Sequence, residues 1–464
     1  MKTRTEYDSM GPIEVPKEAW WGAQTERSRQ NFKIGGEKMP PELLRALVLV
    51  KKMAAVANQR TGKLAAEKAL AIQYAADLLL KGENWDEFPL VVWQTGSGTQ
   101  SNMNANEVIA HLASQKDLTV HPNDDVNMSQ SSNDVFPTAL HIAGTFAIER
   151  TLLPAIHEMV SVLKELEEKN QHVIKIGRTH LQDATPVTFA QEVSGWRSSL
   201  EHNATMLANS LTELRQLAIG GTAVGTGLNA SKAYERAFIE ALNEETGIQF
   251  SGETNKFHAL ANRDAVVYVS GALKALAANC MKMANDIRWL ASGPRSGLGE
   301  ITLPANEPGS SIMPGKINPT QCEALAMVAV QVMGNDTAIG VAASQGNFEL
   351  NVYLPLIAFD LLQSIRLLTD ALHSFSDKCI KGLVVNKDRM ADLLEQSLML
   401  VTALNTHIGY DKGAEIAKKA FNEGTTLKDS ALSLGYVTEE EYENWVRPEK
   451  MIGENVDDLS LIHI

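Results

Sequence analysis

The chain has 464 residues, of which 44% are hydrophobic and 21% are charged, which predicts a folded globular protein of two or three domains. Its formal net charge of −14 argues against nucleic acid and anionic membranes as partners. A small anionic substrate is compatible with this charge, because a local basic pocket can outweigh the global field.

Residues 1–40 are rich in Gly, Pro and Trp and lack periodicity, which predicts an extended lead-in with short strands or turns. The polar residues 1–10 have no apolar core typical of a signal peptide, and no apolar run approaches the length of a membrane span. Cys280, Cys322 and Cys379 lie far apart and form no metal-ligand pair. We therefore expect a cytoplasmic protein without a metal site.

Apolar residues at helical spacing begin at Pro41 and dominate the rest of the chain. The length of the predicted helices favours a mainly α fold with a bundle of extended helices, and alternating β–α units are absent. The longest predicted helices cover residues 151–170, 188–217, 256–290, 321–344, 352–376 and 387–404.

Three consecutive domains are predicted. Residues 1–130 form an N-terminal domain that is mixed and then helical, residues 131–388 form a central long-helix bundle, and residues 389–464 form a small C-terminal helical domain. Several bundle helices carry apolar or small residues on more than one face, as in residues 273–278. Such helices favour an oligomer whose bundle joins several subunits, although a large monomer core would also bury them.

Four polar segments interrupt this helical background. In the first, residues 95–104, Ser97 and Thr99 flank Gly98 ahead of a helix, where hydroxyls and amides can bind a carboxylate. Taken alone, this segment fits an ordinary capping loop. The second, residues 121–134, is too densely polar to be explained by solvated surface only.

The third polar segment, residues 177–186, is predicted to be a short loop that carries His180. A lone histidine is more often a structural hydrogen-bonding residue than a catalytic one. His180, however, stands between an Arg-Thr pair and a Gln-Asp pair, which favours a held and oriented imidazole.

The fourth polar segment, residues 309–319, contains too much Gly and Pro for a helix or strand and predicts a loop. It carries two serines, Lys316 and Asn318 directly ahead of a helix, so its polar groups converge where an anion can sit. In isolation it would also fit an ordinary surface turn.

Two phosphate-binding motifs can be rejected. Five residues separate Gly309 from Gly315, and Ile317 follows the lysine, so the fourth segment is not a P-loop. The glycine-rich residues 220–227 follow no strand pattern and lack the spacing of a dinucleotide-binding loop.

Together, the four segments resemble the fumarase/aspartase superfamily, and specifically the iron-independent class II fumarases. Residues 309–318 are similar to the superfamily signature loop. Residues 177–186 are similar to the fumarase form of that segment, in which aspartases typically carry Gln in place of His180. Residues 319–323 are also fumarase-like, and the resemblance covers nearly the whole chain.

This resemblance implies reversible hydration of fumarate to L-malate, a reaction of the tricarboxylic acid cycle, by acid–base catalysis through a carbanion (aci-carboxylate) intermediate. It implies no metal and no cofactor. It also implies a three-domain, mainly α subunit and a homotetramer in which each active site draws loops from three subunits.

The resemblance assigns catalytic roles to four residues. Ser310 is implied to be the base that removes the C3 proton of malate, and Lys316 to hold the carboxylate that takes up charge. His180, paired with Glu323, is implied to activate or protonate the water or hydroxide at C2. The implied substrate-binding residues are Ser97, Gly98, Thr99, Ser131, Ser132, Asn133, Thr179, Ser311 and Asn318. A second dicarboxylate site is implied at His121, Pro122, Asn123 and Asp124.

Elementary chemistry sets conditions on these roles. A carbon-bound proton beside a carboxylate is very weakly acidic, so the intermediate needs preorganised donors in a water-poor pocket. A serine hydroxyl is too weak a base unless Lys316, loop amides and a helix N-terminus stabilise its alkoxide. A carboxylate beside His180 fixes the tautomer and raises the basicity of the ring.

The sequence departs from the fumarase pattern at two places. Met128 stands where many fumarases carry a basic residue, and residues 454–464 do not resemble a fumarase C-terminus, so they are left out of the fold prediction. Two alternatives remain: an aspartate ammonia-lyase or another lyase of the superfamily, and a catalytically silent helical oligomer. His180 and residues 320–323 count against an ammonia-lyase. The presence of Ser310, Lys316, His180 and Glu323 together counts against a catalytically silent protein.

Overall fold

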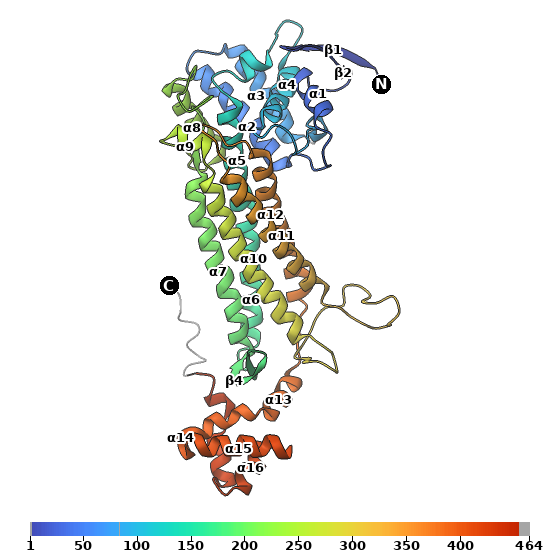
Figure 1. The fold of residues 1–464 in the computed structure, drawn as a ribbon, viewed down its shortest axis with the longest axis vertical. Helices are drawn as coiled ribbons and strands as arrows, with labels where there is room; N and C mark the ends of the chain where they lie inside the picture. Colours follow the sequence, from blue (N-terminus) through green and yellow to red (C-terminus); the bar gives the residue numbers. More distant parts are fainter. Residues whose placement is uncertain (1, 83, 454–464) are drawn as a thin grey trace. The chain divides into compact units, whose positions relative to one another are not determined.

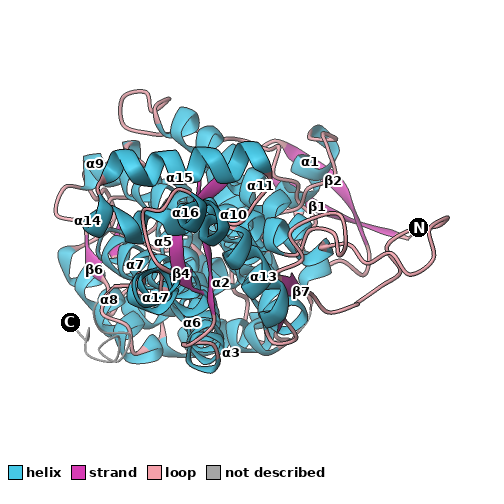
Figure 2. Ribbon diagram, turned by 90° about the horizontal axis from the view of Figure 1, so that it is seen from below, coloured by secondary structure: helices cyan, strands magenta, loops and turns pink. Residues whose placement is uncertain are grey.

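The computed structural model describes residues 2–82 and 84–453, so the divergent tail predicted at 454–464 lies outside the described residues. The chain is mostly helical with few short strands, which confirms the predicted mainly α fold (Figures 1 and 2). It divides into two compact units. The first unit comprises Met1–Ala155, Asn203–Ala278 and Val328–Asp370, and the second comprises Ile156–His202, Asn279–Met327 and Ala371–Ile464. The predicted division into three consecutive domains stays a prediction.

The first unit begins with short strands, which the sequence predicted, and with a helix that it did not predict. Strand β1 (Thr3–Asp8) pairs with β2 (Gly11–Pro16) in antiparallel fashion, as expected for an extended lead-in, and α1 (Ala23–Asn31) follows. The N-terminus of α1 is capped by Glu107, whose carboxylate accepts hydrogen bonds from the backbone of Gly22 and Gln24 at 2.9 Å. Because the capping side chain comes from a distant residue, the sequence next to α1 contains no capping signal that would predict the helix.

The helix α2 (Pro41–Arg60) forms the centre of the first unit. Most of its residues are buried, and it packs against α3 (Ala66–Lys81), α4 (Thr99–Ala113), α5 (Ser132–Ala147) and α8 (Lys232–Thr246). Its apolar residues recur at the helical spacing that predicted a helix from Pro41.

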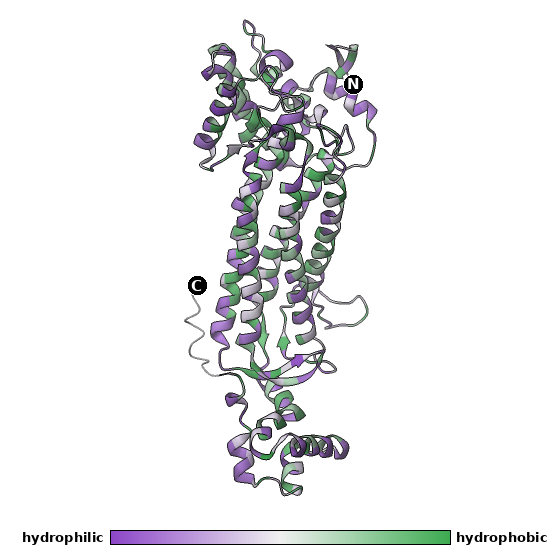
Figure 3. Cartoon of the chain, turned by 60° about the vertical axis from the view of Figure 1, so that its left-hand side comes forward, coloured by the Kyte–Doolittle hydropathy of each residue, from purple (hydrophilic) through white to green (hydrophobic). Residues whose placement is uncertain are grey.

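Most of the long predicted helices are present with small shifts at their ends. They are α6 (Leu153–Lys169), α7 (Phe189–Leu214), α11 (Thr320–Ala343) and α12 (Leu354–Phe375), and α10 (Asp264–Leu290) covers most of a further one. In each unit their segments pack side by side: Trp196 on α7 donates to Asp286 on α10 at 2.9 Å, and Asn335 on α11 donates to Ser364 on α12 at 3.0 Å. Apolar residues recur along these helices (Figure 3).

Two predicted helices are broken. The one predicted at 256–290 consists of α9 (Lys256–Ala261) and α10, separated by the extended Asn262. The one predicted at 387–404 consists of α13 (Lys387–Gln396) and a 3₁₀-helix (Leu398–Leu404). The second break follows from capping, since Ser397 leaves the helical conformation and its side chain accepts from Met399 N at 3.2 Å.

The second unit contains a hairpin where the sequence predicted a loop. Residues 174–188 form the antiparallel strands β3 (Ile174–Thr179) and β4 (Gln182–Thr188). The prediction of a loop at 177–186 is therefore wrong for most of this segment. The polar residues that suggested a loop belong largely to exposed positions of the strands, while Ile176 and Pro186 are buried.

The C-terminal part of the second unit has shorter helices, as expected. Leu404, Ile416 and Ala431 form the centre of a small core there. Its helices are α14 (Asn405–Ile408), α15 (Tyr410–Glu423), α16 (Leu427–Ser433) and α17 (Glu439–Trp445). The remaining short strands pair as β5 (Gln216–Leu217) with β6 (Ser251–Gly252) and β7 (Ile301–Thr302) with β8 (Val384–Val385).

One helix, α11, is long and apolar enough to cross a membrane by length and composition, with a mean hydropathy of 1.3 in its most apolar window. Ala, Gly and Val raise this average, but polar residues such as Asn335 and Asp336 interrupt the helix, so α11 forms no unbroken apolar run, as expected from the sequence. Only 28% of that window is buried within one chain. Met327, Val330 and Val341 on α11 are exposed.

Candidate active site

Three of the predicted substrate-binding hydroxyls meet in the first unit. Ser97 Oγ lies 2.8 Å from Thr99 Oγ1, which in turn lies 2.8 Å from Ser132 Oγ. Thr99 is the first residue of α4 and Ser132 the first residue of α5. The N-termini of two helices therefore converge on one chain of hydroxyls, where backbone N–H groups and both helix dipoles favour an anion.

Two glycines allow this approach. Gly98 caps α4 with φ of 71°, and a Cβ built there would lie 2.1 Å from the ring of the buried Phe136 on α5. A Cβ on Gly96 would lie 1.5 Å from the carbonyl oxygen of Val352. Any side chain at either position would force the loop away from α5 or from the residues before α12.

The start of α5 is fixed by a capping box between Ser131 and Asp134. Ser131 N donates to one oxygen of the Asp134 carboxylate at 2.9 Å, and the other oxygen accepts from Gly220 N at 3.0 Å and Thr222 N at 2.9 Å. Complete burial raises the pKa of Asp134 to about 6. The glycine-rich residues 220–227, rejected above as a dinucleotide loop, thus support the helix that carries Ser132.

Asn133 completes this group. Its side-chain amide donates to Ala223 O at 2.8 Å, and its backbone N–H donates to Ser131 Oγ at 3.2 Å. The structure therefore gathers all the predicted substrate-binding residues of the first unit around the beginnings of α4 and α5. They are Ser97, Gly98, Thr99, Ser131, Ser132 and Asn133.

The signature loop in the second unit is closed on itself. Gly309 N donates to Lys316 O at 2.9 Å, and the Asn318 side chain donates back to Gly309 O at 2.7 Å. The Lys316 ammonium donates to Asn318 Oδ1 at 2.7 Å. The loop lines an open hollow of about 420 Å³ whose lining includes Ser310 and Lys316.

Ser310 is held so that its oxygen points at two backbone donors. Ile312 N and Met313 N donate to Ser310 Oγ at 3.2 Å and 3.0 Å. Both donors would stabilise negative charge on that oxygen, which is the condition that elementary chemistry sets for a serine base. Ser311, Ile312 and Lys316 are exposed in the single chain.

His180 lies at the tip of the β3–β4 hairpin. His180 and Leu181 form its two-residue turn with φ of 57° and 60°, a left-handed conformation that is unfavourable for a bulky residue such as leucine. Both residues and the preceding Thr179 are exposed. Among the described residues, no hydrogen bond or ion pair holds the imidazole of His180.

The base of this hairpin is anchored by a buried ionic network that sequence reasoning missed. The fully buried Glu300 accepts from Arg178 at 2.9 Å and lies 3.3 Å from the ammonium of the buried Lys175. Lys175 also lies 3.2 Å from Glu192. Since Glu300 is far from the hairpin in sequence, no motif could have pointed to it.

Glu323 lies in the first turn of α11 and is exposed. Its expected pairing with His180 is absent among the described contacts of a single chain. The cluster of hydroxyls formed by Ser97, Thr99 and Ser132 belongs to the first unit. His180, Ser310 and Glu323 belong to the second. The predicted sharing of sites between subunits stays a prediction.

The four residues of the predicted second site lie together on one turn. His121 precedes a short π-helix (Pro122–Val126), and its Nδ1 accepts from Asp124 N at 3.1 Å. The turn is anchored by the buried Asp125, which pairs with Lys68 at 2.7 Å. His121, Asn123 and Asp124 remain exposed.

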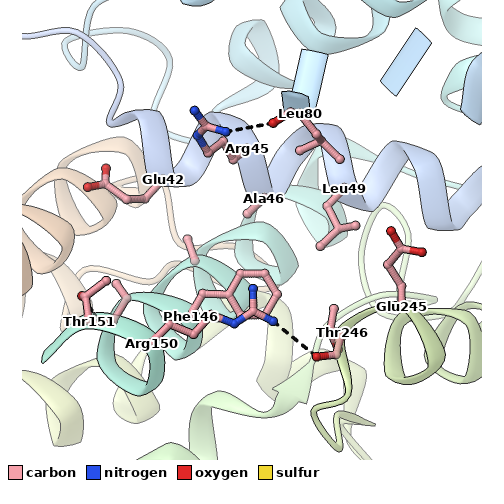
Figure 4. A pocket seen from close by; sticks show the side chains of 12 residues that line it. Glu42, Arg45, Ala46, Leu49, Leu80, Phe146, Arg150, Thr151, Glu245 and Thr246 are labelled. Carbon is pink, nitrogen blue, oxygen red and sulfur yellow. Dashed lines mark hydrogen bonds between the residues drawn. The ribbon is translucent and has the colours of Figure 1, made fainter. Parts of the chain in front are cut away.

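A cavity of about 380 Å³ in the first unit contains none of the predicted site residues (Figure 4). Its floor is apolar, and Arg45 and Arg150 reach it from different helices. Arg45 stacks over Trp85 and Arg150 over Phe146. Because no candidate catalytic group lines it, this cavity is not the candidate active site. In the described part of the chain, no group of three or more His, Cys, Asp or Glu side chains is arranged to hold a metal ion.

Comparison with known families gives two matches. Residues 11–334 match the Lyase family, and residues 400–453 match the family described as Fumarase C C-terminus. Fumarate hydratase class II of Helicobacter pylori is 57% identical over 460 residues, which cover 98% of this chain and 99% of the relative. The enzyme of the same name from Bacillus anthracis is 58% identical over 458 residues, or 97% and 99% of the two chains.

Solved structures give the same result. The class II fumarase from Schistosoma mansoni superposes with a TM-score of 0.95 at 43% identity, covering 97% of this chain and 99% of that chain. A fumarate lyase:delta crystallin from Brucella melitensis, bound to cobalt, superposes with a TM-score of 0.93 at 41% identity and covers 98% and 100% of the two chains.

Proposed function

We propose, from the premise that this chain belongs to the class II fumarate hydratase family, that its paired helix N-termini bind the substrate and that Ser310 is its base. The chain is a lyase that hydrates fumarate reversibly to malate, a reaction of the tricarboxylic acid cycle. Residue roles and the assembly of the site are the parts that we propose.

Substrate binding is assigned to the beginnings of α4 and α5. Hydroxyls of Ser97, Thr99 and Ser132 already share hydrogen bonds at 2.8 Å, so one carboxylate can replace these mutual contacts with contacts to itself. Helix N-termini supply free N–H groups of the correct sign for a dianion. Ser131 and Asn133 hold the start of α5, and Thr179 and Ser311 complete the set from the exposed hairpin and loop.

Proton removal from C3 of malate is assigned to Ser310. The single observation that carries this assignment is the pair of backbone N–H groups on Ser310 Oγ, at 3.0 and 3.2 Å. As the proton leaves carbon, charge moves into the neighbouring carboxylate. Lys316, already oriented by Asn318, supplies the cation that stabilises this aci-carboxylate, and no step requires a metal.

Loss of hydroxide from C2 is assigned to His180 with Glu323. His180 in its cationic form donates a proton to the leaving oxygen, and in the hydration direction the neutral ring accepts a proton from the attacking water. Glu323 would orient the ring and stabilise its charge. The exposure of both side chains in one chain supports a pairing made between copies.

We assign a homotetramer whose sites are each built from three chains. The support is α11, which is apolar but mostly uncovered within one chain and presents Met327, Val330 and Val341 to solvent. Copies of the chain are a better cover than a membrane, because α11 also carries Asp336, which pairs with Lys274, and the buried Asn335. The second dicarboxylate site at His121, Asn123 and Asp124 remains part of this proposal.

The cytoplasm is the compartment that we assign to this reaction. The free thiols of Cys280, Cys322 and Cys379 are all buried, which is compatible with a reducing compartment.

One assay tests the activity. The protein is incubated separately with malate and with aspartate, and formation of the conjugated product is followed by ultraviolet absorbance. We expect fumarate from malate only. Fumarate from aspartate and not from malate would instead identify an ammonia-lyase, and no product from either would identify a catalytically silent relative.

A further inference from the structure

The most unusual buried group outside the proposed machinery is the ammonium of Lys51 on α2. Lys51 is completely buried, yet among the described residues no carboxylate forms an ion pair with it. Its Nζ donates instead to three amide oxygens: Asn102 at 2.6 Å, Gln130 at 2.9 Å and Asn127 at 3.0 Å. An ammonium has three donors and no acceptor, so these contacts satisfy it completely.

Keeping a lysine in such a place is costly. Burial lowers the pKa of Lys51 to about 7, an effect that the charge of Asp134 opposes. A buried charge is retained only when its hydrogen bonds are well made, and an apolar side chain of similar length would fill the same space without that cost. The explanation for a lysine at this buried position therefore lies in the residues that its ammonium contacts.

The three acceptors flank the hydroxyl cluster. Asn102 lies in the first turn of α4, which starts at Thr99, and Gln130 directly precedes the cap of α5. Asn127 links them further, because its Oδ1 also accepts from the side chain of Asn102 at 3.2 Å. One ammonium thus joins the beginnings of both helices to the central helix α2.

A second contact from α2 holds the same segment. Asn58 donates to Met128 O at 2.9 Å, and its Oδ1 accepts from Ser129 Oγ at 2.7 Å. Ser129 has φ of 61°, a conformation that an L-residue adopts only when its surroundings impose it. Within the polar segment 121–134, residues 127–130 thus form the part that is attached to α2.

We propose that Lys51 is a positioning residue for substrate binding: by holding Asn102, Asn127 and Gln130 it sets the separation between the N-termini of α4 and α5. It touches no substrate in this scheme and acts through the hydroxyls of Ser97, Thr99 and Ser132. The proposal rests on the proposed function of those hydroxyls and adds a group that no motif of the family assigned.

The test replaces Lys51→Met, which keeps the length of the side chain and removes its donors. The control is Lys52→Met, the next residue on α2, whose ammonium pairs with Asp77 and Glu245 outside this network. For Lys51→Met we expect KM for both malate and fumarate to rise at least about tenfold. We expect a smaller fall in kcat, since the substitution displaces the substrate-binding hydroxyls and not the proposed catalytic groups. For Lys52→Met we expect both constants to stay within about twofold.

A merely structural role would give another result. A lower thermal midpoint in Lys51→Met with unchanged KM overturns the proposal, as does an equal rise of KM in Lys52→Met. Gln130→Met removes one acceptor and serves if Lys51→Met does not fold. We expect a smaller rise of KM from it, and in the double variant a rise below the product of the single effects, since both act through one contact. Independent effects would contradict the network.

Failure of the proposed function is distinguishable from failure of this inference. Inactive wild-type protein would overturn the hydratase assignment but would say nothing against the contacts that Lys51 makes. A crystal structure of Lys51→Met then tests the positioning directly. We expect Thr99 Oγ1 and Ser132 Oγ, 2.8 Å apart in the wild type, to separate beyond hydrogen-bond distance. Retention of that contact would overturn the positioning role.

Discussion

At the scale of single residues, the proposed chemistry depends on the hydrogen bonds that a few polar atoms make. Ser310 Oγ receives two backbone N–H groups, and Lys316 is oriented by Asn318. These contacts form within the loop itself, so the loop can present them before substrate arrives. Preorganised donors of this kind stabilise developing charge without reorganising at the moment of reaction.

Replacing Ser310→Ala removes the proposed base and leaves the backbone donors in place. We expect kcat for malate to fall by about 10²–10⁴-fold with an unchanged oligomeric mass. Ultraviolet assay of fumarate and light scattering measure the two quantities. The control is Ser311→Ala, an exposed neighbour proposed only to bind substrate, where we expect at most about a tenfold loss. Full activity of Ser310→Ala would remove Ser310 as the base.

His141 on α5 gives a prediction about pH. Its Nδ1 donates to Gln216 O at 2.8 Å, and desolvation, together with the charge of Arg263, lowers its pKa from 6.5 to about 4. The folded protein therefore holds His141 neutral between these values while the unfolded chain is protonated. The contribution of neutral His141 to the free energy of unfolding is fully present above pH 6.5 and is lost as the pH falls towards 4.

The size of this loss is at most about 3 kcal/mol per chain, and water around the half-buried ring reduces it. Urea unfolding at pH 7.5 and pH 5 measures it. His141→Asn keeps a donor for Gln216 O but does not titrate, so we expect a flatter dependence on pH. The same slope in both proteins would show that His141 does not cause it.

At the scale of elements, the candidate site depends on where helices begin. The start of α4 depends on Gly98 in the left-handed conformation, packed against Phe136. The start of α5 depends on a capping box that the sequence shows as Ser131 and Asp134. The hairpin carrying His180 depends on Glu300, which the sequence does not reveal.

Gly98→Ala tests the close approach of α4 and α5. The matched control is Gly247→Ala, because Gly247 has φ of 72° but no atom within 4 Å of an added Cβ, whereas at Gly98 the ring of Phe136 lies 2.1 Å away. We expect about 1–2 kcal/mol of destabilisation at Gly247 and more than about 3 kcal/mol at Gly98. Denaturant unfolding measures both, and equal losses would contradict the packing argument.

At the scale of the whole molecule, the proposed assembly depends on helix α11. Met327, Val330 and Val341 on α11 are exposed in one chain, and so are most of the proposed catalytic residues of the second unit. Association of copies would bury the apolar residues of α11 and would bring the proposed catalytic residues into contact with residues of other subunits. Oligomer formation and activity should therefore be lost together.

Val330→Glu puts a charge on the exposed face of α11. We expect the oligomer to dissociate and the hydratase activity to fall with it, because burying an unpaired carboxylate in each interface costs several kcal/mol. Light scattering and the malate assay measure the two effects. Phe421→Glu on α15, at a side chain that is 77% exposed, is the control and should change neither. A full-sized oligomer of Val330→Glu would rule out this face of α11 as an interface.

The sequence by itself determined most of the long helices, the polar segments between them and the family, because helical periodicity, caps and motifs are patterns of neighbouring residues. Only the tertiary structure decided that Ser97, Thr99 and Ser132 share hydrogen bonds, that Glu107 caps α1, that Glu300 anchors the hairpin and that Lys51 joins two helix starts. Apart from the bond between Ser97 and Thr99, each of these contacts joins residues distant in the chain, so its energy depends on packing that no local pattern records.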